Sequence, residues 1–217
     1  MKTLRIMLAD DHALLRRGVR AILTEHPGWE ICGEAVNGRE AVQMAQKLKP
    51  DIVIMDLAMP ELNGLEATRQ IHRALPRTEI LVLSFDEAES LIHEVIAAGA
   101  RGYVLKNDLS SVLTQAVETL SQHRPYFTPK AAEVLLDSRL RRGSNKNHTK
   151  ERVLLTPRER QIVQLIAEGS STKEVAQALK ISVKTAENHR TNLMRKLKVT
   201  SVTGLVRYAI RNKFIVP

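Results

Sequence analysis

The sequence contains a single cysteine, Cys32, among its 217 residues. One cysteine excludes a disulfide framework and a cysteine-based zinc site within one chain, and it fits a small buried hydrophobe in a reducing cytosol. No apolar run approaches the roughly 20 residues that a membrane span requires. The first residues, MKTLRIMLAD, meet acids too early for a secretory signal. We therefore expect a cytoplasmic chain without a membrane segment.

Charge is distributed unevenly along the chain. Residues 1–121 carry 13 Lys and Arg against 17 Asp and Glu, a net of −4, whereas residues 122–217 carry 20 against 7, a net of +13. An acidic half joined to a strongly basic half indicates two domains with different partners, and the basic half has the profile of a nucleic-acid binder. Charge alone does not decide this, because a basic face can simply be solvated.

The acidic half alternates short apolar runs with stretches of helical periodicity, and no internal repeat is evident. Strands are predicted at 4–9, 29–36, 51–55, 79–84 and 102–105, and helices at about 12–26, 38–48, 63–75, 87–98 and 108–121. Apolar strands that alternate with helices form a parallel sheet with helices on both faces. We expect an α/β domain over 1–121 whose five parallel strands have the order 2-1-3-4-5.

A linker is expected at 122–152, where the periodicity decays. The stretch 141–150, RRGSNKNHTK, is polar, basic and free of proline, which is typical of a flexible connection. Residues 129–140 favour a short helix within this linker. The linker would join the α/β domain to a second domain over 153–217.

The second domain is predicted to be all helical, with four helices. Capping boxes pair Thr156 with Glu159 and Ser171 with Glu174, so they mark the first two helix starts. Ser182 is the expected N-cap of the third helix, and a fourth covers about 201–212. The short turn LKIS between the second and third helices predicts a helix-turn-helix.

Polar residues stand where four predicted strands end. These residues are Asp10, Asp11, Asp56, Ser84 and Lys106. Because the carboxyl ends of parallel strands meet at one edge of a sheet, we expect the side chains to converge. Clustered carboxylates need a counter-charge, which Lys106 and a divalent cation would supply, and Mg²⁺ suits such oxygen ligands. Taken singly, Asp11 and Ser84 are equally explained as helix caps and Lys106 as a surface lysine; together they indicate a site.

Four motifs carry a family resemblance: ADD at 9–11, MDLAMPELNG at 55–64, LS at 83–84 and GYVLK at 102–106. They resemble the motifs of a response-regulator receiver domain over about residues 1–121. The resemblance implies that Asp56 accepts a phosphoryl group from a phosphohistidine on a sensor histidine kinase. It also implies a Mg²⁺ site formed by Asp10, Asp11, Asp56 and the backbone carbonyl of Ala58.

The same resemblance implies a switch around the phosphoryl group. Lys106 would bind one phosphoryl oxygen, Ser84 would move to hydrogen-bond another, and Tyr103 would change rotamer in response. The chemistry agrees, because an added phosphoryl group brings about −1.5 to −2 charge that pulls on a nearby hydroxyl and ammonium. The expectation is a signal receiver that catalyses only its own phosphoryl transfer and dephosphorylation, rather than a metabolic enzyme.

Two further residues stand beside this pocket. Many receivers have a cis proline after the lysine, whereas Asn107 follows Lys106 here, so the lysine must be placed by other packing. His12 is expected on the first helix beside the pocket. We interpret His12 as a surface or capping side chain rather than a ligand.

The third helix of the basic half has two dissimilar sides. One stripe holds Lys184, Glu187, Asn188, Thr191, Arg195 and Lys198, and the opposite side holds Val183, Ala186, Leu193, Met194 and Leu197. An apolar face against a core and a polar stripe of this composition is what a major-groove reader requires. An ordinary solvated face remains the alternative.

The stretch from Leu155 to Val199 resembles a LuxR-type helix-turn-helix of the NarL/FixJ group of response regulators, over roughly 155–214. The resemblance implies a homodimer on double-stranded DNA that forms on phosphorylation. By their positions in the family's motif, the residues that would face the base edges of the DNA are Lys184, Glu187, Asn188 and Thr191. By the same resemblance, the candidates for contacting DNA phosphates, or for supporting the residues that do, are Thr172, Lys173, Thr185, His189, Arg190 and Lys196. Leu205 and Val206 of the fourth helix are candidates for dimerisation, and they are equally well explained as core.

Three other functions compete with this interpretation. A magnesium-dependent phosphohydrolase with an aspartyl nucleophile needs a second acid two residues after Asp56, and that position is Ala58. A nucleotide-binding module would show a glycine-rich loop after the first strand, which is missing. A DNA binder whose receiver no longer switches stays open, although the intact set of pocket residues weighs against it. We expect a phosphorylation-switched, DNA-binding transcriptional regulator.

Overall fold

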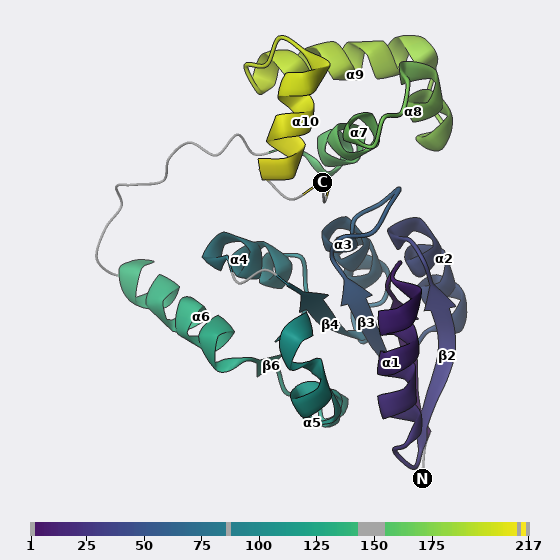
Figure 1. Cartoon of the computed structure of the whole chain (residues 1–217), viewed down its shortest axis with the longest axis vertical. Helices are drawn as coiled ribbons and strands as arrows, with labels where there is room; N and C mark the ends of the chain where they lie inside the picture. The colour runs from purple at the N-terminus through teal and green to yellow at the C-terminus, as the bar shows by residue number, and fades with distance from the viewer. Residues whose placement is uncertain (1–2, 86–87, 143–154, 212–213, 216–217) are drawn as a thin grey trace. The chain divides into compact units, whose positions relative to one another are not determined.

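The computed structural model describes residues 3–85, 88–142, 155–211 and 214–215 of the chain (Figure 1). These residues form two compact units, and we describe each by itself. The first unit contains every strand of the described residues, and the second contains the four carboxy-terminal helices. The expected flexible stretch at 141–150 lies outside the described residues from position 143 onward.

The first unit is a parallel sheet with the strand order β2-β1-β3-β4-β5-β6. Its strands are β1 Leu4–Ala9, β2 Trp29–Ala35, β3 Ile52–Asp56, β4 Glu79–Ser84, β5 Gly102–Leu105 and β6 Tyr126–Phe127. Its helices are α1 Ala13–Thr24, α2 Gly38–Leu48, α3 Gly64–Ala74, α4 Glu89–Ala97, the 3₁₀ helix η1 Lys106–Asp108, α5 Leu109–Ser121 and α6 Pro129–Arg142. The predicted α/β class and the order 2-1-3-4-5 are confirmed.

The strand β6 corrects the prediction of five strands. Tyr126 pairs with Gly102 and Phe127 with Tyr103, so β6 extends the sheet beyond β5. The sequence pattern missed it because only two residues pair and prolines stand on both sides, which hides any alternation. The stretch assigned to a linker therefore begins with a sheet edge, followed by α6 where a short helix was favoured.

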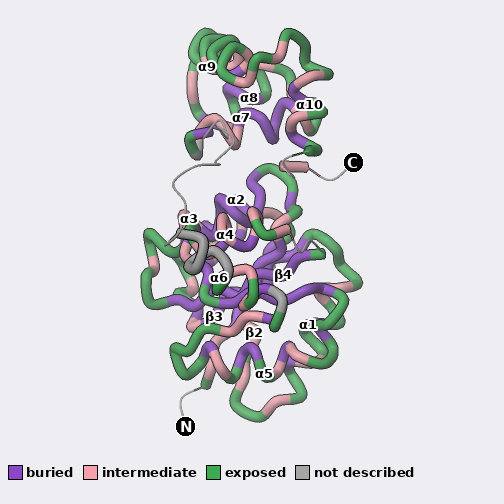
Figure 2. The backbone as a smooth tube through the Cα atoms, turned by 90° about the vertical axis from the view of Figure 1, so that its left-hand side faces the viewer, coloured by how far each residue is buried: buried purple, intermediate pink, exposed green. Residues whose placement is uncertain are grey.

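The residues of the central strands are buried, as the colouring in Figure 2 shows. Successive apolar side chains of these strands point to opposite faces of the sheet. Ile6, Ile54 and Leu81 point to one face, where they pack with apolar residues of α1 and α5 such as Leu23 and Leu113. The helices α2, α3 and α4 contact one another in turn and cover the other face. All five residues of β3 are buried, which makes β3 a central strand and delivers Asp56 to its carboxyl end.

The second unit consists of α7 Pro157–Ala167, α8 Thr172–Ala178, α9 Val183–Lys196 and α10 Val202–Arg211. Thr156 and Ser171 form the predicted capping boxes, and the Ser182 hydroxyl accepts a bond from the Thr185 amide. Each helix contributes to one apolar cluster, through Ile162, Val175, Leu193 and Leu205 among others. The connection between α8 and α9 is the short turn of a helix-turn-helix, as predicted.

We expect Gly99→Ala to destabilise the first unit by about 1–3 kcal/mol. Gly99 has φ +104°, and a Cβ there would lie 2.3 Å from Cγ of His72. The matched control is Gly18→Ala, because Gly18 lies within α1 and a Cβ there meets nothing within 4 Å. That change should stabilise the helix by about 0.5–1 kcal/mol. Urea unfolding followed by the fluorescence of Trp29, the single tryptophan, measures both; equal effects would contradict the account.

Candidate functional site

Three carboxylates meet at the carboxyl ends of β1 and β3. Asp10 and Asp11 directly follow β1, and the pairing of Ala9 with Met55 places them beside Asp56. Asp10 and Asp56 are only 5% and 2% exposed, whereas Asp11 is open to solvent. One ligand atom from each of these acids, together with one from His12, lies within 4.8 Å of the others. The convergence expected from the sequence is therefore present.

Lys106 lies between the two buried acids. Its Nζ is 2.9 Å from Oδ2 of Asp10 and 2.9 Å from Oδ2 of Asp56, and its side chain is only 2% exposed. The ring of Phe85 lies 5.3 Å from the same ammonium. None of the peptide bonds in the described residues is cis. Two ion pairs hold the Lys106 ammonium, and its backbone begins η1.

The protonation of Asp56 reflects this environment. Burial raises the pKa of Asp56 above its ordinary value, Lys106 opposes the rise, and the charge of Asp10 adds to it. One ammonium beside three carboxylates leaves an excess of negative charge. Oδ2 of Asp56 is buried and has its ion pair with Lys106 but no aligned hydrogen bond. A hard divalent cation fits this donor set, because it prefers carboxylate oxygens and would remove the excess charge.

The segment after Asp56 is held against it by backbone contacts. The Ala58 amide donates to Oδ1 of Asp56 at 3.4 Å, and the Gly64 amide donates to the Leu57 carbonyl at 2.9 Å. A Cβ on Gly64 would lie 1.8 Å from the carbonyl oxygen of Asp56. Glycine is therefore required where α3 begins, because any side chain would displace the backbone of Asp56.

The remaining predicted pocket residues lie on β4, which is next to the strand of Asp56, and on β5 beyond it. Ser84 ends β4 and is buried at the same edge of the sheet, where Asp56 pairs with Leu83. Tyr103 lies on β5, pairs with Val82 and is fully buried. The structure thus brings together Asp10, Asp11, Asp56 and Lys106 in direct contact range, with Ser84 at the adjacent strand end.

The sequence interpretation of His12 is incomplete. His12 occupies the N-cap position of α1, but its side chain makes no capping hydrogen bond. The imidazole faces the acids instead, with Nδ1 2.9 Å from Oδ1 of Asp11 and 3.4 Å from Oδ1 of Asp10. Its place directly after the two acids was the only signal in the sequence.

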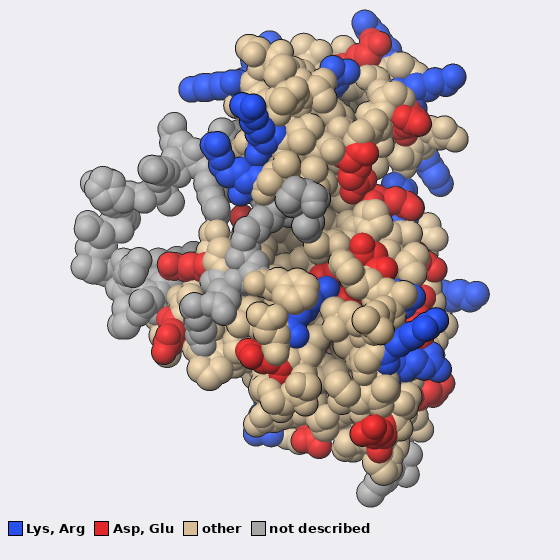
Figure 3. Space-filling model, viewed as in Figure 1, with Lys and Arg blue, Asp and Glu red and all other residues tan. Residues whose placement is uncertain are grey.

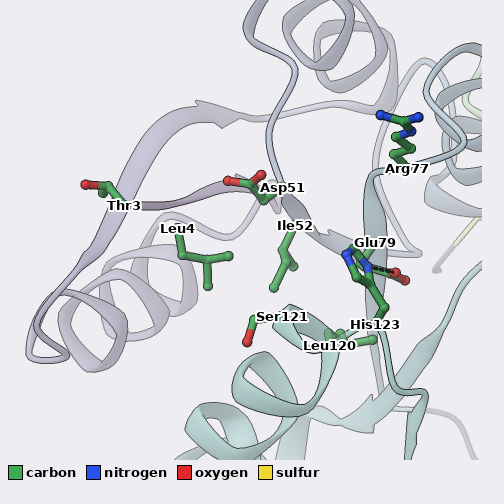
Figure 4. Close-up of a pocket in the computed structure, with 9 residues that line it drawn as sticks. All are labelled: Thr3, Leu4, Asp51, Ile52, Arg77, Glu79, Leu120, Ser121 and His123. Carbon is green, nitrogen blue, oxygen red and sulfur yellow. Dashed lines mark hydrogen bonds and ion pairs between the residues drawn. The ribbon is translucent and has the colours of Figure 1, made fainter. Parts of the chain in front are cut away.

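A separate cavity of about 190 Å³ lies at the opposite end of the strands (Figure 4). It is lined by residues at the amino ends of β1, β3 and β4, among them Leu4, Ile52 and Glu79. Nδ1 of His123 lies 2.8 Å from Oε1 of Glu79, so this carboxylate is already paired. The cavity holds none of the predicted site residues.

The helix α9 presents the expected polar face. All four residues that the family resemblance expects at base edges are exposed: Lys184, Glu187, Asn188 and Thr191. Figure 3 shows basic side chains projecting from this unit. Among the residues of α9, only Ala186 and Leu193 are fully buried. Val183 is 43% exposed, so its placement on the core side was wrong, because the first turn of α9 extends beyond the core.

The candidates for phosphate contacts are partly engaged within the unit. Arg190 donates from Nη1 to the Thr172 hydroxyl at 3.3 Å. Nζ of Lys196 lies 2.7 Å from Oε2 of Glu159. Lys173 and Thr185 are exposed, and His189 is half-buried. Thr172 and Arg190 therefore join α8 to α9, whereas Lys173 is open to solvent.

Leu205 and Val206 differ in position. Leu205 is fully buried in the apolar cluster, which assigns it to the core rather than to a dimer surface. Its helical register turns it toward α7 and away from solvent. Val206 is half-buried, and the exposed apolar residues of α10 are Val202 and Ile210 at 40% and 37%.

Two family models match the chain. The response regulator receiver domain matches residues 6–118, and the luxR family of bacterial regulatory proteins matches residues 153–209. The transcriptional regulatory protein LiaR of Bacillus subtilis is 39% identical over 98% of this chain and 99% of its own length. The oxygen regulatory protein NreC of Staphylococcus carnosus is 38% identical, with the same shares covered.

Solved structures agree with these matches. RcsB from Salmonella enterica serovar Typhimurium, bound to promoter rprA in the presence of phosphomimetic BeF₃⁻, is 25% identical with a TM-score of 0.61, covering 95% of this chain and 98% of that one. A LuxR-family response regulator from Aurantimonas sp. SI85-9A1 is 34% identical with a TM-score of 0.60, covering 64% of this chain and 99% of that one.

The fold and the matches define a receiver domain joined to a LuxR-type DNA-binding domain. The chain belongs to the NarL/FixJ group of two-component response regulators, which are DNA-binding regulators of transcription. No helix of the described residues is long and apolar enough to cross a membrane.

Proposed function

We propose that Asp56 is the phosphoacceptor of this response regulator and that its phosphorylation changes dimerisation and DNA binding. The receiver would span 1–121, the linker 122–152 and the DNA-binding domain 153–217. The observation that carries the proposal is the placement of Asp56 at the end of β3, beside two acids and within 2.9 Å of the Lys106 ammonium. The phosphoryl donor would be a histidine kinase in the cytoplasm.

The chemistry follows from the contacts of Asp56. A carboxylate oxygen would attack phosphorus while the phosphorus–nitrogen bond of phosphohistidine breaks and the electron pair leaves with the imidazole. Such a transfer depends on positioning and on neutralising charge at the phosphoryl oxygens rather than on a strong nucleophile. Lys106 is placed to bind one of these oxygens. Slow hydrolysis of the same aspartyl phosphate would reset the domain.

Magnesium is the proposed cofactor. Asp10, Asp11, Asp56 and the carbonyl of Ala58 would hold it, and it would supply the positive charge that Lys106 alone does not provide. A hard divalent cation suits this site because three of the proposed donors are carboxylates.

The switch would run through Ser84 and Tyr103. Ser84 lies on β4, which pairs with the strand of Asp56, and Tyr103 lies on β5, the next strand beyond β4. Both side chains are buried, so a move of either one requires repacking. New phosphoryl charge would draw the Ser84 hydroxyl toward Asp56, and Tyr103 would change rotamer in the space that is vacated. A buried two-position element of this kind can pass a local charge change to the surface of the domain.

The DNA-binding domain would place α9 in the major groove. Lys184, Glu187, Asn188 and Thr191 would face base edges from its exposed stripe. Thr172, Lys173, Thr185, His189, Arg190 and Lys196 would contact phosphates or support those contacts. In one of the similar solved structures, two RcsB dimers are bound to two parallel DNAs, which supports a dimer on DNA here.

We place the dimer contact on one face of α10. Val202, Val206 and Ile210 follow each other at four-residue spacing, and none of them is fully buried. Leu205 supports this face from the core instead of contacting the partner.

The test of the phosphoacceptor is incorporation from a phosphorus–nitrogen donor such as phosphoramidate in the presence of Mg²⁺. Intact-protein mass should rise by one phosphoryl group in the natural chain and stay unchanged in Asp56→Asn. Asp108→Asn is the matched control, because Asp108 is an exposed aspartate of η1, and it should incorporate normally. Incorporation that persists in Asp56→Asn would refute the assignment.

A further inference from the structure

Phe85 directly follows the buried strand β4, yet the residue is 67% exposed. Ser84 pairs with Leu105, so the next residue of each chain segment, Phe85 and Lys106, stands at the carboxyl edge of the sheet. A single exposed apolar side chain is common on protein surfaces. The contacts of the Phe85 ring therefore decide whether this residue has a role.

The ring of Phe85 lies over the ammonium of Lys106. The Nζ atom is 5.3 Å from the ring centroid, within the roughly 6 Å at which a cation is attracted to an aromatic face. The Lys106 side chain is only 2% exposed, so the open ring lies on the solvent side of the ammonium. The same Nζ is 2.9 Å from Oδ2 of Asp56, where phosphoryl oxygens would be bound.

We propose that Phe85 is a cover of the phosphoryl site that slows hydrolysis of phosphorylated Asp56 and lengthens the signal. The inference rests on the proposed function of Asp56 and adds a residue that binds neither the cation nor the phosphoryl group. In hydrolysis, a water oxygen attacks phosphorus, the bond from phosphorus to the Asp56 oxygen breaks, and its electron pair returns to the carboxylate. The water proton leaves with the phosphate. An apolar ring at the site occupies space and offers this water no hydrogen bond.

The hold of the ring on Lys106 sets the size of the effect. An exposed side chain changes rotamer in nanoseconds or less, so the covered and open positions of the ring are at equilibrium during hydrolysis. A cation–π contact favours the covered position by about 2–30-fold. Removing the ring leaves the site always open, so hydrolysis should become faster by about the same factor.

The alternative role of the ring is only to position Lys106. Without the ring, the ammonium would then bind a phosphoryl oxygen less well, and phosphoryl transfer into Asp56 would become slower. A cover predicts the opposite change, because its removal opens the site to a small phosphoryl donor as well as to water. The direction of the change in transfer rate therefore separates the two roles.

The test is the rate of phosphoryl uptake from phosphoramidate by the full chain with Mg²⁺, and of phosphoryl loss after the donor is removed. Intact-protein mass follows both rates. Phe85→Ala should lose the phosphoryl group about 2–30-fold faster than the natural chain and take it up faster as well. Phe85→Tyr keeps the aromatic ring and should restore the natural rates. Leu136→Ala is the matched control, because Leu136 is a 63% exposed apolar residue of α6, and both of its rates should be natural.

Three results would overturn the cover. These are phosphoryl loss from Phe85→Ala that is no faster than from the natural chain, slower uptake by the same variant, and Phe85→Tyr rates equal to those of Phe85→Ala. Uptake is measured first on the natural chain and on Asp56→Asn. A natural chain that takes up no phosphoryl group refutes the proposed function itself and the cover with it, whereas normal uptake with unchanged loss in Phe85→Ala refutes the cover alone.

Discussion

The affinity of the chain for duplex DNA is expected to fall about 10³-fold between 50 and 200 mM salt. Three cationic side chains are proposed to reach phosphates, Lys173, Arg190 and Lys196, which makes six in a dimer. Each neutralised phosphate contributes about −0.9 to the slope of log affinity against log salt, so six give a slope near −5. Fluorescence anisotropy with a duplex selected by the chain from a random pool measures this slope.

Two variants sharpen this prediction. Lys173→Ala should make the slope shallower by about 2 per dimer while leaving the preference among sequences unchanged. Lys47→Ala, which removes an exposed charge from α2 of the receiver, should leave the slope as it is. A flat salt dependence in the natural chain would contradict the DNA-binding role of the basic half.

Lys106→Met should destabilise the receiver by about 3–5 kcal/mol at neutral pH. Methionine keeps much of the volume, but the ammonium within 2.9 Å of Asp10 and Asp56 is lost and leaves two buried carboxylates uncompensated. The pKa of Asp56, already raised by burial, should rise further without this lysine. The measurement is urea unfolding followed by Trp29 fluorescence.

The pH dependence of this variant has a defined sign. A carboxyl whose pKa is raised in the folded state contributes stability that is present at low pH and lost as the pH rises through the folded pKa. The destabilisation of Lys106→Met should therefore shrink toward acid pH, near and below the ordinary aspartate value of 3.8. Lys47→Met, an exposed lysine changed in the same way, should show neither effect. Equal stabilities of Lys106→Met and Lys47→Met at pH 7 would refute the buried ion-pair account.

The acidic cluster was predictable because the apolar runs in the sequence determine where the parallel strands end. Continuous apolar runs such as that before Asp56 indicate parallel strands, and the carboxyl ends of such strands meet at one edge. Asp10, Asp11, Asp56 and Lys106 could therefore be brought together from the pattern alone. The contacts that place Lys106 without a proline, the two ion pairs and the ring of Phe85, depend on tertiary packing and were not predictable.

The features that could not be predicted from the sequence are those that depend on tertiary packing. The strand β6 pairs through only two residues, which is too short for an alternating pattern of apolar and polar residues to be recognised in the sequence. Leu205 and Val206 are adjacent apolar residues of one helix, and only the fold shows that Leu205 faces the core. His12 could cap α1 or face the acids, and the choice depends on a side-chain rotation that the sequence pattern does not encode.

The central claim is that phosphorylation of Asp56 switches DNA binding. The most direct measurement compares duplex DNA affinity and dimerisation of the natural chain and of Asp56→Asn, with and without beryllium fluoride and Mg²⁺. The account predicts a rise of about 5–150-fold in DNA affinity, the usual scale of coupling between two sites, in the natural chain and none in Asp56→Asn. No change in affinity or dimerisation, under conditions in which Asp56 is shown to be modified, would contradict it.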